Sequence, residues 1–152
     1  IEGVANTNPI REPDLDFQNI SFKSLVKIEK DQKKQFSLQD MQWTPSPSPY
    51  PMKNGLRFPV GTYELTCKIQ PQWQRFVACV GAQFRGRPSP VEVWIDGQRV
   101  TSTEKSERTY LERQIDISIP ANHAGKTFRL KINNANRNHH AVFFGNIGFS
   151  KK

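Results

Sequence analysis

The stretch WQRFVACVGAQFRGRPSPVEVWIDG, residues 73–97, decides the fold class of this chain. It holds two short apolar runs, Phe76–Val80 and Val91–Ile95, which are rich in β-branched and aromatic residues and are bounded by turn formers. This is the pattern of β-strands. In the second run the apolar residues alternate with Glu92 and Trp94, so the two faces of the predicted strand differ.

Turn signals bound these predicted strands on every side. Residues 85–90, RGRPSP, are a basic loop that its prolines exclude from a helix. Asp96-Gly97 after an alternating strand predicts a hairpin into residues 98–100. Upstream, residues 63–69 alternate, and we expect them to pair with residues 73–80 as an antiparallel hairpin through the turn at 70–72.

Alternation continues on both sides of this stretch. It predicts an edge strand within residues 15–28, strands at 115–119 and 128–132, and a last strand at 141–149 with a glycine kink. Residues 29–35 are predicted as a charged turn. About eight to ten short strands, spaced by ~8–12 residues, indicate an all-β fold, a jelly-roll-type β-sandwich of antiparallel strands.

The length of 152 residues suits one domain with a core of its own. Residues 1–14 are polar, include two prolines and are predicted to be a flexible linker or an expression remnant, without the features of a secretion signal. Residues 15–152 are then a single β-sandwich domain. No apolar run approaches the ~18 residues of a membrane span.

The net charge of +8 favours anionic partners such as acidic glycans, nucleic acid or a cell surface. Alternatively, the dispersed charge serves solubility. The chain lacks zinc-finger spacing and an RNP-like aromatic strand, which disfavours nucleic acid. Seven basic residues are candidates for one basic face: Arg85, Arg87, Arg99, Lys126, Arg129, Lys131 and Arg137.

The two cysteines, Cys67 and Cys79, do not fix the compartment. Cys67 shares strand parity with Leu65, whereas Cys79 is out of phase with Phe76 and Val80. If both apolar sets line the same core, the two sulfurs point to opposite faces. This geometry disfavours a disulfide.

The order of motifs in the last hundred residues resembles the novel putative carbohydrate-binding module family (NPCBM). The resemblance covers roughly residues 55–149. It implies a jelly-roll sandwich, a lectin-like role beside an attached domain and a location outside the cytoplasm. The motifs that carry it are KIQPQWQRF (68–76), VG (80–81), VWIDG (93–97), IDI (115–117), FRLKI (128–132) and NHHAVF (138–143).

The chain departs from the family pattern at three places. Val142 stands where the family has an acidic residue, Phe143 stands where it has a tryptophan, and Arg57–Val60 replaces a small polar stretch. The resemblance therefore implies the scaffold and leaves the ligand open, because fold alone does not carry function.

A sugar site needs an aromatic plate together with planar polar side chains. The alternative for Trp73 is a packing aromatic at the start of a strand. For Trp94 the pattern favours a core position over an exposed plate. The predicted ligand-binding residues are Trp43, Tyr50, Trp73, Arg85, Arg87, Asn136, Asn138, His139 and His140.

No catalytic residue, metal or cofactor is predicted. The chain has no nucleophile motif, and His139-His140 with His123 lacks cysteine or carboxylate partners at ligand spacing. The proline-rich residues 44–54 favour a stiff surface loop over a ligand for another protein. The predicted function is a non-catalytic carbohydrate-binding module that targets an attached domain, with acidic or cell-wall (extracellular) polysaccharide as the candidate ligand. The alternative is a protein-interaction or structural module without a sugar site.

Overall fold

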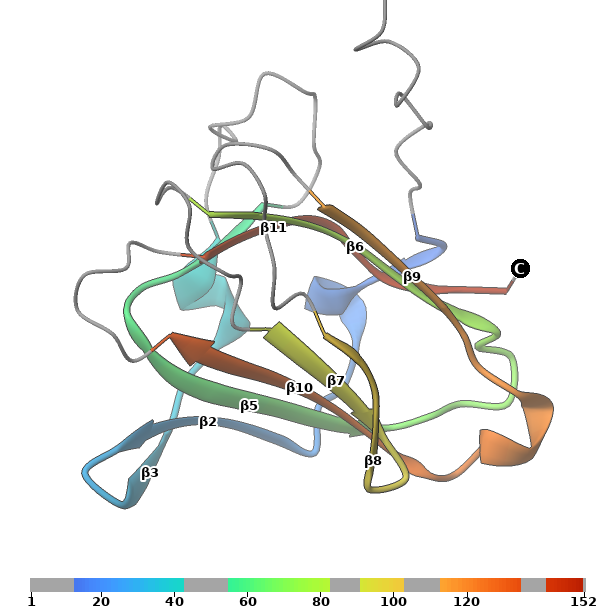
Figure 1. The fold of residues 1–152 in the computed structure, drawn as a ribbon, viewed down its shortest axis with the longest axis horizontal. Helices are drawn as coiled ribbons and strands as arrows, with labels where there is room; N and C mark the ends of the chain where they lie inside the picture. Colours follow the sequence, from blue (N-terminus) through green and yellow to red (C-terminus); the bar gives the residue numbers. More distant parts are fainter. Residues whose placement is uncertain (1–12, 43–54, 83–90, 103–112, 135–141, 152) are drawn as a thin grey trace, which may run out of the picture.

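Two antiparallel sheets face each other across one core (Figure 1). A computed structural model describes residues 13–42, 55–82, 91–102, 113–134 and 142–151. Within these residues there are eleven strands and three short 3-10 helices, η1 (Phe17–Asn19), η2 (Leu38–Met41) and η3 (Ala121–His123). The predicted jelly-roll-type β-sandwich of antiparallel strands is confirmed.

Sheet A has the order β1-β11-β6-β9, and β4 also pairs with β11. The last strand, predicted at 141–149, is β11 (Val142–Ser150), a central strand that is buried along its whole length. The predicted kink is a β-bulge between Gly145 and Gly148, where Asn146 has a φ of 49° that asparagine tolerates. The strands of sheet A are β1 (Leu15–Asp16), β4 (Leu56–Phe58), β6 (Arg75–Ala82), β9 (Arg113–Ser118) and β11 (Val142–Ser150).

Sheet B has the order β3-β2-β5-β10-β7-β8. Its strand β10 lies between β5 and β7, so residues of β10 occupy the middle of the sheet (Figure 1). The strands of sheet B are β2 (Ser24–Glu29), β3 (Gln32–Gln35), β5 (Gly61–Lys68), β7 (Val91–Ile95), β8 (Gln98–Ser102) and β10 (Thr127–Asn134).

The core forms from the apolar parity of each strand. In sheet B, Leu130 lies between Leu65 and Val93 in one cross-strand row, and all three are fully buried. The rings of Phe76 in sheet A and Phe128 in sheet B are 4.9 Å apart and join the two layers. Burial of such side chains contributes on the order of 2 kcal/mol each.

The predicted hairpin between residues 63–69 and 73–80 is wrong. Strand β5 pairs with β2 and β10 in sheet B, whereas β6 pairs with β9 and β11 in sheet A. The segment between them crosses from one sheet to the other, with Ile69 N–H bonded to Lys126 O and Gln74 N–H bonded to Ser150 O. A short turn signal fits either connection, since it does not specify the partner strand.

The predictions for residues 15–35 need a second correction. Residues 15–28 do not form one edge strand, because β1 belongs to sheet A and β2 to sheet B. Residues 32–35 of the predicted charged turn are the edge strand β3, all exposed. Lys30 and Asp31, with φ of 48° and 67°, make the two-residue turn before it. Lysines suit an exposed edge because they oppose pairing with another chain.

The parity prediction for the cysteines is confirmed. Cys67 is in the core on β5, whereas Cys79 is buried on β6 outside the core cluster. The two cysteines are not joined by a disulfide. Burial raises the pKa of the Cys67 thiol to about 12.

Candidate functional site

Trp94 lies on the outer face of sheet B. In β7 the side chains of Val91, Val93 and Ile95 are buried, whereas Glu92 and Trp94 are half-buried on the opposite face. The favoured core position for Trp94 is therefore wrong. The physical reason is that sheet A packs against the other face of β7, where the three aliphatic residues lie.

Two contacts fix the Trp94 indole. Its Nε1–H donates a hydrogen bond of 2.9 Å to Glu92 Oε1, two residues earlier on the same strand face. The Lys131 ammonium lies over the indole, 4.6 Å from a ring centroid, which is a cation–π contact. The register supports this geometry, because Lys131 is opposite Glu92 and Arg129 is opposite Trp94.

An open depression of about 390 Å³ lies beside the indole. A two-residue turn at Asp96 and Gly97, with φ of 52° and 79°, follows β7 and places an exposed carboxylate there. The Asp96 N–H donates to Thr127 O at 2.9 Å and ties the turn to β10. The lining residues are Trp94, Asp96, Gly97, Thr127, Arg129 and Lys131.

Among the residues that line the depression, two are cationic and one is acidic. On the same outer face, Lys131 lies between Glu64 of β5 and Glu92 of β7, whereas Arg129 lies between Thr66 and Trp94. Within the described part of the chain, neither Arg129 nor Lys131 forms an ion pair. Arg129 Nε instead donates to the hydroxyl of Thr66 at 3.4 Å. Glu92 is already engaged, since it accepts from Trp94 and lies 3.6 Å from Arg99. The depression thus combines two cationic donors, one carboxylate acceptor and an apolar wall, a combination that suits a polar ring with an apolar face.

A second depression, of about 450 Å³, lies beside Trp73. Trp73 is only 6% exposed, and its ring stacks on Phe149 with centroids 4.0 Å apart and planes 7° apart. Trp73 is therefore a packing aromatic and not the predicted open plate. Arg75, also at this depression, is held by Asp116 through an ion pair of 2.5 Å.

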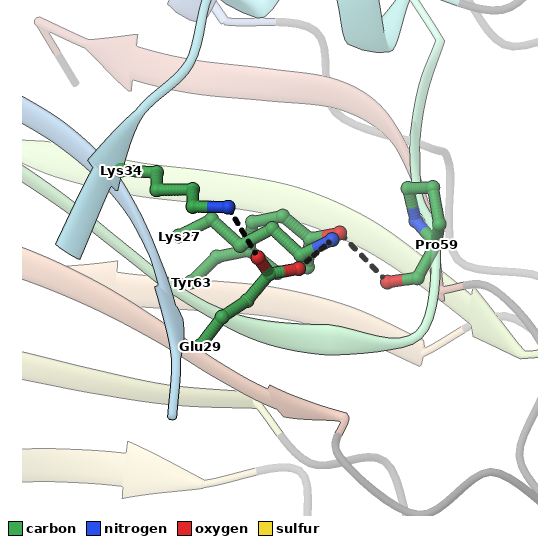
Figure 2. Close-up of polar contacts among 5 residues, drawn as sticks. All are labelled: Lys27, Glu29, Lys34, Pro59 and Tyr63. Carbon is green, nitrogen blue, oxygen red and sulfur yellow. Dashed lines mark hydrogen bonds and ion pairs between the residues drawn. The ribbon is translucent and has the colours of Figure 1, made fainter. Parts of the chain in front are cut away.

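A polar cluster links the β2–β3 hairpin to β5 (Figure 2). Glu29 forms ion pairs with Lys27 at 3.1 Å and with Lys34 at 3.2 Å. The Tyr63 hydroxyl donates a hydrogen bond of 3.0 Å to Pro59 O. The bond to Glu29 raises the pKa of Lys27, and the two lysines lower the pKa of Glu29. Burial raises the pKa of Tyr63. These groups largely satisfy one another, which indicates a structural role.

The other predicted ligand-binding residues lie outside the described residues and stay predictions. The two family positions with departures, Val142 and Phe143, are described and are buried in β11. The residues outside are Trp43, Tyr50, Arg85, Arg87, Asn136, Asn138, His139 and His140.

Two further observations concern the described residues alone. No set of three or more His, Cys, Asp or Glu side chains among them is arranged to hold a metal ion. None of the helices they form is long and apolar enough to cross a membrane.

Sequence reasoning found part of the Trp94 depression. Arg129 and Lys131 are two of the seven candidates for the basic face. They alternate with Phe128, Leu130 and Ile132, whose burial places the two cations on the outward side of β10. Asp96 was predicted only as a turn residue. The sequence signal for these residues is the alternation in FRLKI (128–132) and VEVWI (91–95). That alternation does not show that the residues lie together, which follows only from the pairing of β7 with β10.

No family model and no curated protein matches the chain, so the resemblance to the NPCBM family stays a prediction. Three solved structures of domains from Clostridium perfringens ZmpB are similar in fold. The CBM51-2 and INT domains give a TM-score of 0.56 at 10% identity, covering 89% of this chain and 31% of that one. The same domains with GlcNAc bound to CBM51-2 give 0.55 at 11% identity, with coverage of 89% and 31%. The M60 catalytic domain with CBM51-1 and CBM51-2 gives 0.50 at 12% identity, covering 95% and 14%.

These identities establish a shared β-sandwich fold and no more. This chain spans less than a third of each of the three ZmpB chains. The fold thus places the chain among β-sandwiches of the kind that CBM51 carbohydrate-binding modules have.

Proposed function

We propose that this chain is a non-catalytic carbohydrate-binding module whose sugar site is the depression beside Trp94. The observation that carries the proposal is the convergence of an indole, two cationic side chains and a carboxylate on one open depression. The fold shared with CBM51 modules, one of them solved with GlcNAc, supports it.

The residues divide the task of recognising a sugar. The indole of Trp94 offers an apolar wall for the C–H face of a pyranose ring. Arg129 and Lys131 donate hydrogen bonds to sugar oxygens, and the Asp96 carboxylate accepts from hydroxyl groups. No bond is made or broken in this scheme, so the module holds a glycan without changing it.

The net charge of +8 supports an acidic or cell-wall polysaccharide as the ligand, met outside the cytoplasm. In this role the module would target an attached domain. Binding raises the effective concentration of that domain at its polysaccharide, without any new contact.

The test is a glycan array of neutral and acidic polysaccharides, read at low salt and at about 0.3 M salt, where exposed charges are largely screened. We expect binding that persists at the higher salt and falls about tenfold or more in Trp94→Ala, since the stacking wall is lost. Val100→Ala is the control, because Val100 is exposed on the neighbouring strand β8 and does not line the depression.

Thermal melts of both variants establish that they fold. Unchanged binding by folded Trp94→Ala would contradict the proposed site. If wild-type protein binds no glycan, the function is wrong, and the alternative of a protein-interaction module on the same basic sandwich is favoured.

A further inference from the structure

We infer that the depression beside Trp94 holds the anionic substituent, carboxylate or sulfate, of an acidic sugar, through Arg129 and Lys131. This inference rests on the proposed function and names the ligand class of the same site. It is drawn from the placement of these two cations and from how their neighbours are engaged.

The two cations are held on a rigid part of the fold. They lie two residues apart on β10, which is paired with β5 on one side and β7 on the other. The Thr66 hydroxyl holds Arg129 Nε, and the Trp94 indole holds the Lys131 ammonium. Each side chain has thus lost part of its freedom before a ligand arrives, which lowers the entropic cost of binding.

The acids near the two cations are unevenly placed. Glu64 and Glu92 lie opposite Lys131 in the neighbouring strands, whereas Arg129 lies opposite Thr66 and Trp94. Glu92 is engaged by Trp94 and Arg99, and Asp96 is the one carboxylate among the residues that line the depression. Within the depression itself, two cations against one carboxylate attract an anion. An arginine guanidinium binds carboxylate or sulfate oxygens as a two-pronged donor, and a lysine ammonium adds a point charge.

Asp96 orients such a ligand. It lies in the turn after β7, at one side of the depression, whereas both cations come from β10. Its carboxylate repels the anionic group of the ligand and accepts hydrogen bonds from hydroxyl groups. The arrangement therefore directs the anion toward β10 and neutral hydroxyls toward the turn, in a depression that Trp94 also lines.

The test uses three probes that differ only at C6: methyl glucoside, methyl glucuronide and methyl glucoside 6-sulfate. Affinities are measured by NMR titration at about 0.05 M salt and again at about 0.3 M, and the shift of the Trp94 indole N–H reports contact with this site. We expect at least one anionic probe to bind about tenfold tighter than the glucoside, a preference of about 1.4 kcal/mol.

The variant Arg129→Gln/Lys131→Gln should lose this preference, so that it binds the anionic probes no more tightly than the glucoside. Lys33→Gln is the matched control, since Lys33 is an exposed lysine on the edge strand β3 of the same sheet. It should keep the preference. Thermal melts show that the double variant is folded.

Each outcome decides one question. A preference for the glucuronide alone, or for the sulfate alone, supports the inference and identifies the anion. Equal binding of all three probes overturns the inference and leaves the sugar-binding function standing. A preference that survives in folded Arg129→Gln/Lys131→Gln also overturns it. Failure of every probe to shift the indole overturns both the inference and the site.

Discussion

At the scale of single residues, Trp73 and Trp94 show how position decides the role of one residue type. Trp73 is buried against Phe149, so its buried apolar surface and its ring stacking both stabilise the core. Trp94 is half-buried on an outer sheet face and holds a lysine ammonium. Replacing Trp73 should therefore mainly reduce stability, whereas replacing Trp94 should mainly reduce glycan binding.

Trp73→Ala should destabilise the fold by about 3–5 kcal/mol, because it leaves a cavity beside Phe149. Trp94→Ala should cost much less, since Trp94 is only half-buried. Urea denaturation of both variants measures the difference. Equal losses would contradict the assignment of Trp73 to packing and Trp94 to the surface.

The thiol of Cys67 predicts a loss of stability at alkaline pH. Burial raises its pKa from 9.0 to about 12, so the unfolded chain gives up this proton at lower pH than the folded one. The contribution is complete below pH 9 and falls as pH rises toward 12, by at most about 1.4 kcal/mol per pH unit.

The test compares the urea midpoints of wild type and Cys67→Ala at pH values from about 8 to 10.5. The midpoint of Cys67→Ala should fall less than that of wild type above the ordinary thiol pKa. The same burial predicts that native Cys67 stays unmodified by a thiol reagent that labels the unfolded chain. Rapid labelling of Cys67 in the folded protein would contradict its burial.

At the scale of elements, a few side chains decide how hairpins and strands attach to the sandwich. The β2–β3 hairpin is joined to β5 by pairing of β2 and by the Lys27 ammonium, which lies 5.7 Å from the centroid of the Tyr63 ring (Figure 2). Strand β1 is only Leu15–Asp16, and it reaches β11 where Gly148 leaves room for it. Each attachment can be tested by one substitution.

Glu29→Gln should remove part of the acid sensitivity of the protein. The two lysines lower the pKa of Glu29 below its ordinary value of 4.5, so its contribution is present above pH 4.5 and is lost as pH falls through the lower folded value. Because the group is exposed, the effect is small and is weakened by salt.

Thermal melts at pH values between about 3 and 6 measure this acid-dependent loss of stability, and Asp31→Asn in the adjacent turn is the control. An acid-induced loss of the same size in wild type and Glu29→Gln would show that the cluster does not contribute.

Gly148→Ala should displace β1 from β11. A Cβ atom at residue 148 would overlap the carbonyl oxygen of Leu15, which is backbone and cannot turn away. We expect a destabilisation of about 1–3 kcal/mol, measured by urea denaturation, with loss of amide protection in residues 15–16.

Gly125→Ala is the control that separates backbone strain from steric clash as the cause of destabilisation. Gly125 has a φ of 83° and open space around it, so alanine there adds backbone strain without a clash. Retained protection of residues 15–16 in Gly148→Ala would contradict the steric explanation.

At the scale of the whole molecule, the sandwich buries one face of sheet B, and the opposite face carries the depression beside Trp94. Cross-strand pairing collects Arg129, Lys131 and Trp94, which are separated in sequence, at the middle of that outer face. Strands are a rigid support, and rigid supports hold binding groups more precisely than loops. The proposed glycan site thus follows from the architecture and from two cations, Arg129 and Lys131, that form no ion pair with the described residues.

The sequence by itself determined the fold class, the parity of β6, β7 and β10, and the opposite orientation of the two cysteines. It could do so because a period-2 pattern is local and reports which residues of a strand share a face.

Tertiary structure decided which strands became neighbours, and therefore the separation of β5 from β6 and the edge strand β3. It also decided that Trp94 lies outside and Trp73 inside. The physical reason is that alternation separates two faces of a strand without saying which strands pair or which face a second sheet will cover. Only the register between β7 and β10 brings Trp94, Arg129 and Lys131 to one place.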